Sequence, residues 1–377
     1  MHRYVRAFLS AAVLCGTPHA HGAAQTGGAE APAGLLAGTV GAAEGGSPVP
    51  FALVTLPDLD RRMFAAADGT FLVSGLPAGR VRLRVEQVGR ATVDTAVQMP
   101  LPVARRGDPS AFVVRMPVRP VALEAIAVPA AAGECATRGL SDPATAPTAA
   151  AVMEALRVNA DRYRALIDEY PLRIRSVRTE RFLAPDGSVR GERTDTSAFS
   201  TSERRRPYVP GAVLVQEGQS GWRLYMPSVY EVAQPAFQEH HCFRYAGVAE
   251  AGGRRVHRIE FVPTRDVAGP DVAGALSMDA SDGTLSGATF RLLNVPARGV
   301  SFDSVTSSVT YRQIRPTLSI PDRIHTTQRL RNARWQGERV VASEAVDQVV
   351  DARFLAADPG DRPAAPAASG ASHPSTQ

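Results

Sequence analysis

Two side chains stand at a spacing that can bind zinc. His257 and Glu260 form a His-x-x-Glu pair, and imidazole and carboxylate groups are common zinc ligands. The alternating residues around them predict a β-strand, in which side chains three positions apart point to opposite faces. A catalytic zinc also needs a third protein ligand. The histidines that follow Glu260 in the sequence are His325 and His373, and neither is near the pair in sequence. We therefore expect neither a zinc centre nor zinc-dependent peptidase activity.

A second group of metal-binding types is the run His240, His241 and Cys242. Neighbouring strand residues alternate between faces, so at most two of the three side chains converge on one point. No further ligand can be named from the sequence. We predict no metal site and no cofactor.

Carboxylates offer hydrolytic chemistry, and Asp266, Asp271, Asp279 and Asp282 are the candidates. Asp279 and Asp282 flank a predicted hairpin turn, where Asp is favoured for its hydrogen bonds to the backbone. A glycosidase pair can come from any two strands, so spacing alone does not reveal it. The chain has no Gly-x-Ser-x-Gly nucleophile motif and no Gly-rich phosphate loop. A hydrolase with dispersed carboxylates therefore stays open, and we predict no catalytic residue.

Aromatic residues gather between positions 222 and 245, and Trp222, Tyr225 and Tyr230 are the candidate ligand contacts. Such residues stack on sugars and other ligands, but they more often fill cores. Trp222 and Tyr225 are of opposite parity on a strand, so one is expected to be buried and the other exposed. Packing is the favoured interpretation.

The first 24 residues are typical of a secretory signal peptide, with basic Arg3 and Arg6, an apolar stretch over 7–14 and small residues near a cleavage site at Gly22 to Ala24. A lipoprotein cut before Cys15 would place bulky Leu14 where a small residue is needed, so lipid anchoring is not expected. No later segment has the roughly 20 apolar residues of a membrane helix. The protein is predicted to be periplasmic or secreted.

Signal cleavage would leave two of the three cysteines, Cys135 and Cys242. In an oxidising compartment a disulfide between them is the expected state, and two buried thiols are the alternative.

All 42 basic residues are Arg, and the formal net charge is only +5. The densest run, Arg204 to Arg206, is interpreted as a solvated loop, and no nucleic acid partner is expected.

Residues 34–129 show the pattern of a β-sandwich. A Gly-Thr-Val opening at 38–40, an Asp-Gly hairpin at 68–69 and alternation through Val81, Leu83 and Val85 are the main signals. The pattern resembles the carboxypeptidase regulatory-like domain, a transthyretin-like, carbohydrate-binding-like sandwich of seven strands. The family usually has aromatic residues where this chain has Arg80 and Arg90. The resemblance implies an accessory module without catalytic residues of its own, and zinc carboxypeptidase activity remains unexpected.

A linker is predicted over 130–147, followed by a second domain over 148–355. Helical spacing runs from Thr148 to the residue before Pro171, and antiparallel hairpins follow it. We expect an α+β domain in which a long antiparallel meander curls around one helix, giving a mainly β protein overall. This half-barrel resembles the lipoprotein-carrier fold in architecture alone. The tail over 356–377 is predicted to be disordered.

Short phrases of the second domain also resemble exported bacterial proteins of unknown activity that pair it with such a sandwich. These phrases are His-Cys-Phe at 241–243, the strand Ile259 to Pro263 and a Gly-x-Leu-x-x-Asp hairpin at 274–279. The resemblance supplies an architecture and no activity.

The leading functional hypothesis is a non-enzymatic exported protein that binds a ligand or supports an envelope assembly. Its partner would be an envelope protein, a lipid or a glycan. A periplasmic lipid or lipoprotein carrier is the first alternative, and it requires an open apolar concavity. The hydrolase is the second, and it requires two acidic groups that converge in a cleft.

Overall fold

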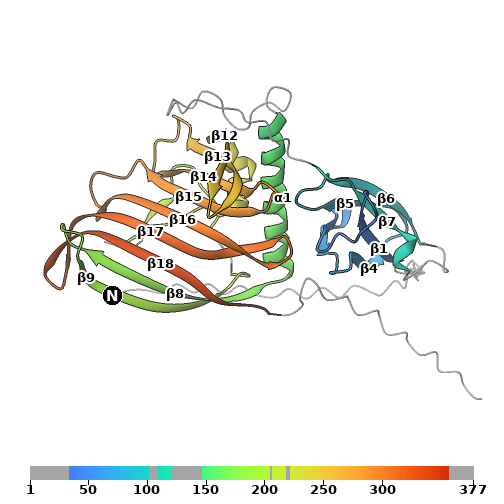
Figure 1. Cartoon of the computed structure of the whole chain (residues 1–377), viewed down its shortest axis with the longest axis horizontal. Coiled ribbons are helices and arrows are strands. Elements are labelled where there is room, and N and C mark those ends of the chain that lie inside the picture. The colour runs from blue at the N-terminus through green and yellow to red at the C-terminus, as the bar shows by residue number, and fades with distance from the viewer. Residues whose placement is uncertain (1–33, 102–107, 120–146, 204–205, 218–220, 356–377) are drawn as a thin grey trace, which may run out of the picture.

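The protein was analysed as a computed structural model, which describes residues 34–101, 108–119, 147–203, 206–217 and 221–355 (Figure 1). These residues form a small β-sandwich, a long helix α1 and a large antiparallel sheet. The mainly β fold predicted from the sequence is confirmed. In Figure 1, α1 stands between the sandwich and the large sheet.

The sandwich has the seven strands expected for it. One sheet has the order β4-β1-β7 and the other has the order β3-β2-β5-β6. The strands are β1 (Gly34–Ala42), β2 (Leu53–Leu56), β3 (Arg61–Phe64), β4 (Thr70–Leu76), β5 (Gly79–Glu86), β6 (Val93–Met99) and β7 (Val113–Met116), with short 3-10 turns at Pro57–Leu59 and Pro109–Ala111. Leu36, Val54 and Leu83 are among the fully buried side chains between the two sheets.

The Asp-Gly hairpin lies before β4, as its sequence predicts. The carboxylate of Asp68 accepts a hydrogen bond from the backbone N–H of Thr70 at 3.0 Å. Gly69 has a φ of +79°, and a Cβ there would lie 2.5 Å from the carbonyl oxygen of Val40. Only glycine therefore fits this turn without strain.

The second part of the fold begins with α1 (Pro147–Glu169). Its buried positions include Val152, Leu156 and Ala160, whose spacing puts them on one face. That face packs against Phe261 and Leu276 of the sheet, in one apolar core.

The large sheet has nine strands in the order β12-β13-β14-β15-β16-β17-β18-β8-β9. The strands are β8 (Leu172–Leu183), β9 (Val189–Ser200), β12 (His241–Ala251), β13 (Arg254–Pro263), β14 (Asp271–Asp279), β15 (Leu285–Leu293), β16 (Phe302–Arg315), β17 (Leu318–Trp335) and β18 (Glu338–Phe354). β12 to β18 form the predicted meander. The first hairpin of the domain, β8 and β9, joins its far end through β18, for example at Ala352 and Ile174.

The meander does not include the segment between β9 and β12. Strands β10 (Leu214–Glu217) and β11 (Gly221–Leu224) form a separate two-stranded sheet. Two short helices that the sequence analysis missed, α2 (Val229–Val232) and α3 (Pro235–Gln238), follow it. Each has only four residues, which is too short for helical periodicity to show.

The face of the large sheet that packs against α1, here called the inner face, changes character from one end to the other. One row of paired residues crosses all nine strands: Phe243, Phe261, Gly274, Phe290, Ser307, Thr326, Ala345, Glu180 and Arg193. The row is aromatic where α1 covers it and polar over β8 and β9. On this polar end Arg193 bonds to Glu180 at 2.9 Å, and Arg178 bonds to Asp347 at 2.7 Å.

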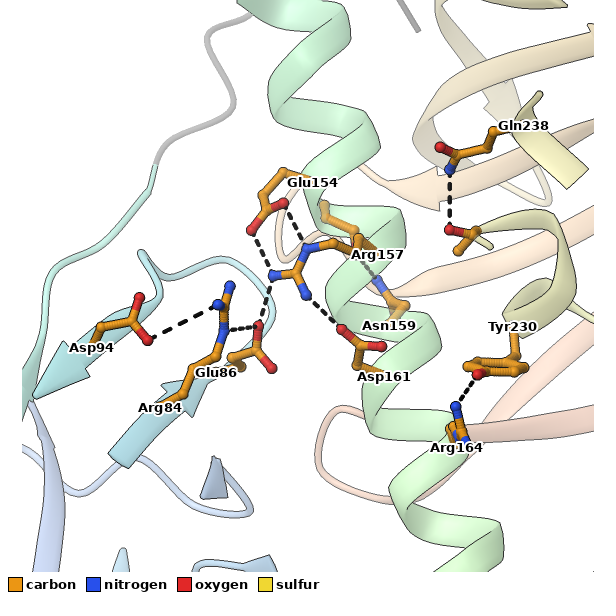
Figure 2. A network of polar contacts seen from close by, with 12 residues as sticks. Arg84, Glu86, Asp94, Glu154, Arg157, Asn159, Asp161, Arg164, Tyr230 and Gln238 are labelled. Carbon is orange, nitrogen blue, oxygen red and sulfur yellow. Dashed lines mark hydrogen bonds and ion pairs between the residues drawn. The ribbon is translucent and has the colours of Figure 1, made fainter. Parts of the chain in front are cut away.

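The sandwich and the second domain share a buried apolar cluster. Phe51 and Phe64 of the sandwich meet Leu166 of α1 and Leu318 of β17 there. Beside this cluster Arg157 of α1 donates to the buried Glu86 of β5 at 2.6 Å, and Figure 2 shows this contact within a larger polar network. A shared core of this kind holds the two parts in one arrangement.

Candidate ligand-binding pocket

A pocket of about 640 Å³ opens beside the C-terminal half of α1. Its other walls come from residues 201–203 and 206–208 and from α2 and α3. Tyr163, Ile167, Tyr208, Tyr230 and Phe237 provide its aromatic and aliphatic surface. Pockets of this size and lining commonly bind small molecules.

Local sequence places two of these walls. Ser228 caps the N-terminus of α2, and its backbone N–H donates to the Glu231 carboxylate at 2.7 Å, which completes a capping box. Pro235 begins α3, where the missing N–H of proline costs nothing. The two turns direct Tyr230 and Phe237 toward the pocket.

Tyr230 is held from the side of α1. The guanidinium of Arg164 lies 4.9 Å from the centre of the Tyr230 ring and donates a hydrogen bond to its hydroxyl (Figure 2). Arg164 also bonds to Asp168 at 3.2 Å. Asp168 in turn accepts a bond of 3.1 Å from Arg62 of the sandwich, so a residue of the first domain reaches the wall of the pocket.

A buried polar pair lies behind the aromatic wall. The ring of Phe237 stacks on that of His241, with centroids 3.7 Å apart and planes 3° apart. The Tyr208 hydroxyl donates to Asp271 at 2.8 Å, and burial raises the pKa of Tyr208 well above its usual range. His241 and Asp271 are both fully buried, with 3.7 Å between Nε2 and Oδ1. This pair supports the wall from beneath and is closed to a ligand.

The three aromatic residues proposed as ligand contacts have different positions. Tyr230 lines the pocket. Tyr225 lies next to it, under the guanidinium of Arg206 at 5.0 Å, and Arg206 also lines the pocket. Trp222 donates from Nε1 to the carbonyl oxygen of Gly299 at 2.6 Å and packs against the main core, and both it and Tyr225 are partly buried, not one buried and one exposed.

Sequence reasoning missed Tyr208 and Arg206 as pocket residues. The basic run to which Arg206 belongs was assigned to a solvated loop, and Arg206 is indeed exposed. The adjacent Arg206-Pro-Tyr208 sequence, a cation next to an aromatic residue, was the available signal. This signal could not be interpreted from the sequence, because it did not show that α1 lies on the opposite side of the pocket.

The His-x-x-Glu pair lies on β13, as expected. His257 is buried and its Nδ1 is 2.8 Å from the hydroxyl of Tyr245. Glu260 is half-buried and pairs with Arg244 and with Arg258, the latter at 3.2 Å. The two side chains therefore have separate partners.

The four candidate aspartates are scattered. Asp271 belongs to the buried pair, and Asp279 and Asp282 accept bonds from backbone N–H groups at their turn, at 2.8 Å each. None of these three lines the pocket, and neither does Asp266.

Of the predicted disulfide, Cys242 lies on β12, whereas Cys135 is outside the described residues. The predicted signal peptide, the tail and most of the linker also lie outside them. Among the helices that are described, none combines the length and the apolar character needed to cross a bilayer.

Structural comparison finds solved structures that resemble about half of this chain. A domain named for outer membrane lipoprotein sorting, from Vibrio parahaemolyticus, matches 54% of this chain and 93% of its own, at 14% identity and a TM-score of 0.28. A LolA superfamily protein from Nitrosomonas europaea matches 55% of this chain and 94% of its own, at 13% identity and a TM-score of 0.27. No curated protein matches the sequence.

The first domain has a match at the level of family. Residues 36–108 match the sequence profile of the carboxypeptidase regulatory-like domain. These residues cover the two sheets of the sandwich up to the segment before β7. Over residues 36–108 the N-terminal β-sandwich is thus a carboxypeptidase regulatory-like domain.

Proposed function

We propose that this protein is an exported, non-enzymatic binding protein that takes a small ligand in the pocket beside α1. The observation that carries the proposal is the pocket itself, about 640 Å³ in volume, with three tyrosines and a phenylalanine in its walls. Tyr208 and Tyr230 are partly exposed there, with Phe237 and Tyr163 buried behind them, and ligand pockets are commonly lined by such aromatic side chains.

The charged groups of the pocket support binding more than catalysis. A hydrolase with two carboxylates needs one of them as an acid and the other as a base or nucleophile. Asp168 is held by Arg62 and Arg164, and Glu231 is held by the N-terminus of α2. Both carboxylates are thus held by donors within the protein and not by each other, so they do not form the facing pair that such a hydrolase needs.

A lipid or lipoprotein carrier is the second candidate, and the inner face of the sheet limits where it could hold its cargo. The part of that face outside the aromatic core carries Glu180, Arg178, Asp347 and Arg193. Burying an acyl chain there would desolvate these charges without new partners. Cargo of a carrier would therefore have to occupy the same pocket beside α1.

Native mass spectrometry of protein purified from the periplasm tests the proposal without knowledge of the ligand. We expect a bound mass that disappears on denaturation, and a lipid-sized mass would select the carrier. Fluorescence titration with the neutral probe N-phenyl-1-naphthylamine provides the second test, because its aromatic body suits the walls of the pocket.

The Tyr230→Ala variant should weaken probe binding, whereas Trp335→Ala, which removes an aromatic residue outside the pocket, should not. Absence of both a bound mass and a saturable probe signal in the wild-type protein would rule out the proposed function.

A further inference from the structure

We propose that the ligand is a monoanionic amphiphile, whose negative group is bound by Arg206 while its apolar body lies against the aromatic walls. This inference rests on the proposed function and names the chemical class of the ligand. It follows from which charged groups of the pocket already have partners in the protein.

The acidic side chains of the pocket have their hydrogen bonds in place. Asp168 accepts from Arg62 at 3.1 Å and from Arg164 at 3.2 Å. Glu231 accepts from the N–H of Ser228, and Glu203 accepts from the N–H of Ser200 at 3.2 Å. These bonds engage one oxygen of each carboxylate, so all three acidic groups already have a donor within the protein.

Among the described residues that line the pocket, the arginines Arg164 and Arg206 differ in whether they have such partners. Arg164 has Asp168 and the Tyr230 hydroxyl as acceptors. Arg206 forms no ion pair and donates no hydrogen bond to any residue that the structure describes, and its contact is the ring of Tyr225 at 5.0 Å. Stacking on an aromatic ring orients a guanidinium and leaves the N–H groups at its edge available.

An anion is the group that these N–H donors fit. A planar guanidinium binds carboxylate, sulfonate or phosphate oxygens with two parallel hydrogen bonds, which are stronger than bonds between neutral groups. The walls formed by the partly exposed Tyr208, Tyr230 and Ile167 fit an aromatic or aliphatic body. Glu203 and Glu231 also line the pocket and would repel additional negative charge, so the geometry favours one charge on the ligand over several.

Two probes with the same aromatic skeleton test this inference. 1-Anilinonaphthalene-8-sulfonate carries one negative charge, and N-phenyl-1-naphthylamine lacks the sulfonate. We expect wild-type protein to bind the sulfonate probe more tightly. Arg206→Gln should lower the affinity for that probe roughly tenfold, which is the size expected for the loss of one charge-assisted contact. It should change the affinity of the neutral probe less than about twofold, because the apolar walls remain.

Matched variants separate the charge of Arg206 from other effects. Arg206→Lys keeps the charge and should retain most of the binding of the sulfonate probe. Arg80→Gln removes an exposed arginine of the sandwich and should leave both probes unaffected. Added salt should weaken binding of the sulfonate probe to the wild-type protein, and it should weaken binding to Arg206→Gln much less.

The outcomes distinguish the two proposals. The role of Arg206 would be overturned if Arg206→Gln kept its affinity for the sulfonate probe, or if Arg80→Gln lost as much of that affinity as Arg206→Gln. The proposed pocket would still be supported in that case if binding of the neutral probe depended on Tyr230. If neither probe responds to Tyr230→Ala, the pocket is not the binding site and both proposals fail.

Discussion

Arg162 of α1 donates a hydrogen bond of 2.6 Å to the main-chain carbonyl oxygen of Phe51 in the sandwich. The same guanidinium reaches the Thr317 hydroxyl at 2.8 Å, beside the start of β17. Arg162 is only 1% exposed, and burial lowers its pKa to about 9, so it is still charged at neutral pH. One cation therefore joins the sandwich, the helix and the large sheet.

Replacing Arg162 by Met should destabilise the protein by about 2–4 kcal/mol, because the buried carbonyl oxygen of Phe51 would lose its donor. Urea unfolding of the full chain measures the change. The control is Arg80→Met at an exposed site, expected to change the free energy of unfolding by less than about 0.5 kcal/mol. If Arg162→Met were as stable as the wild-type protein, the hydrogen bonds of Arg162 to carbonyl oxygens would make no net contribution to the free energy of unfolding.

The stability of the protein should fall as the pH drops below about 6.5, in part because of His257. Burial, with a smaller contribution from Arg255, lowers the pKa of His257 in the folded state. The unfolded chain then binds more protons between that lowered pKa and the ordinary value of 6.5, so stability is complete above this window and is lost as pH falls through it.

Urea unfolding at pH 7.5 and pH 5.5 checks this pH dependence, and His257→Phe should show a smaller difference between the two conditions. An NMR titration of the folded protein should find the midpoint of the His257 ring below 6.5. A midpoint at or above 6.5 would contradict the explanation.

Gly191→Ala should destabilise the hairpin of β8 and β9 by about 1–3 kcal/mol through overpacking. A Cβ at position 191 would lie 2.0 Å from Nε1 of Trp335, whose ring stacks on Phe182 with centroids 4.2 Å apart. Urea unfolding and tryptophan fluorescence follow the displacement of the indole. Gly287→Ala is the control, since its Cβ would meet its nearest neighbour at 3.4 Å.

A disulfide between Cys135 and Cys242 remains a prediction, and mass spectrometry tests it directly. The unreduced, denatured protein should be about 2 Da lighter than the reduced protein. The bridge would close a loop of roughly a hundred residues, and its loss should cost about 4–5 kcal/mol if it is unstrained. A peptide map that shows both cysteines as free thiols would disprove it.

Local features were predictable from the sequence because their causes are local. The Asp68-Gly69 turn depends on a short side chain and a positive φ at adjacent positions. The helix predicted from Thr148 to before Pro171 is α1, since its apolar spacing and the proline that follows it are both visible in the sequence. The hairpins of β12 to β18 follow the turns between them in the same way.

The tertiary structure decided what lies next to what. The pairing of β18 with β8 joins Ala352 to Ile174, and no local pattern encodes a contact across such a separation. The pocket unites Tyr163 of α1 with Tyr208, Tyr230 and Phe237 from three later segments. The sequence by itself determined that aromatic residues gather between positions 222 and 245, a stretch that holds Tyr230 and Phe237 but not Tyr163 or Tyr208. Which of them face a ligand and which face the core depends on where α1 packs, and that is a property of the whole fold.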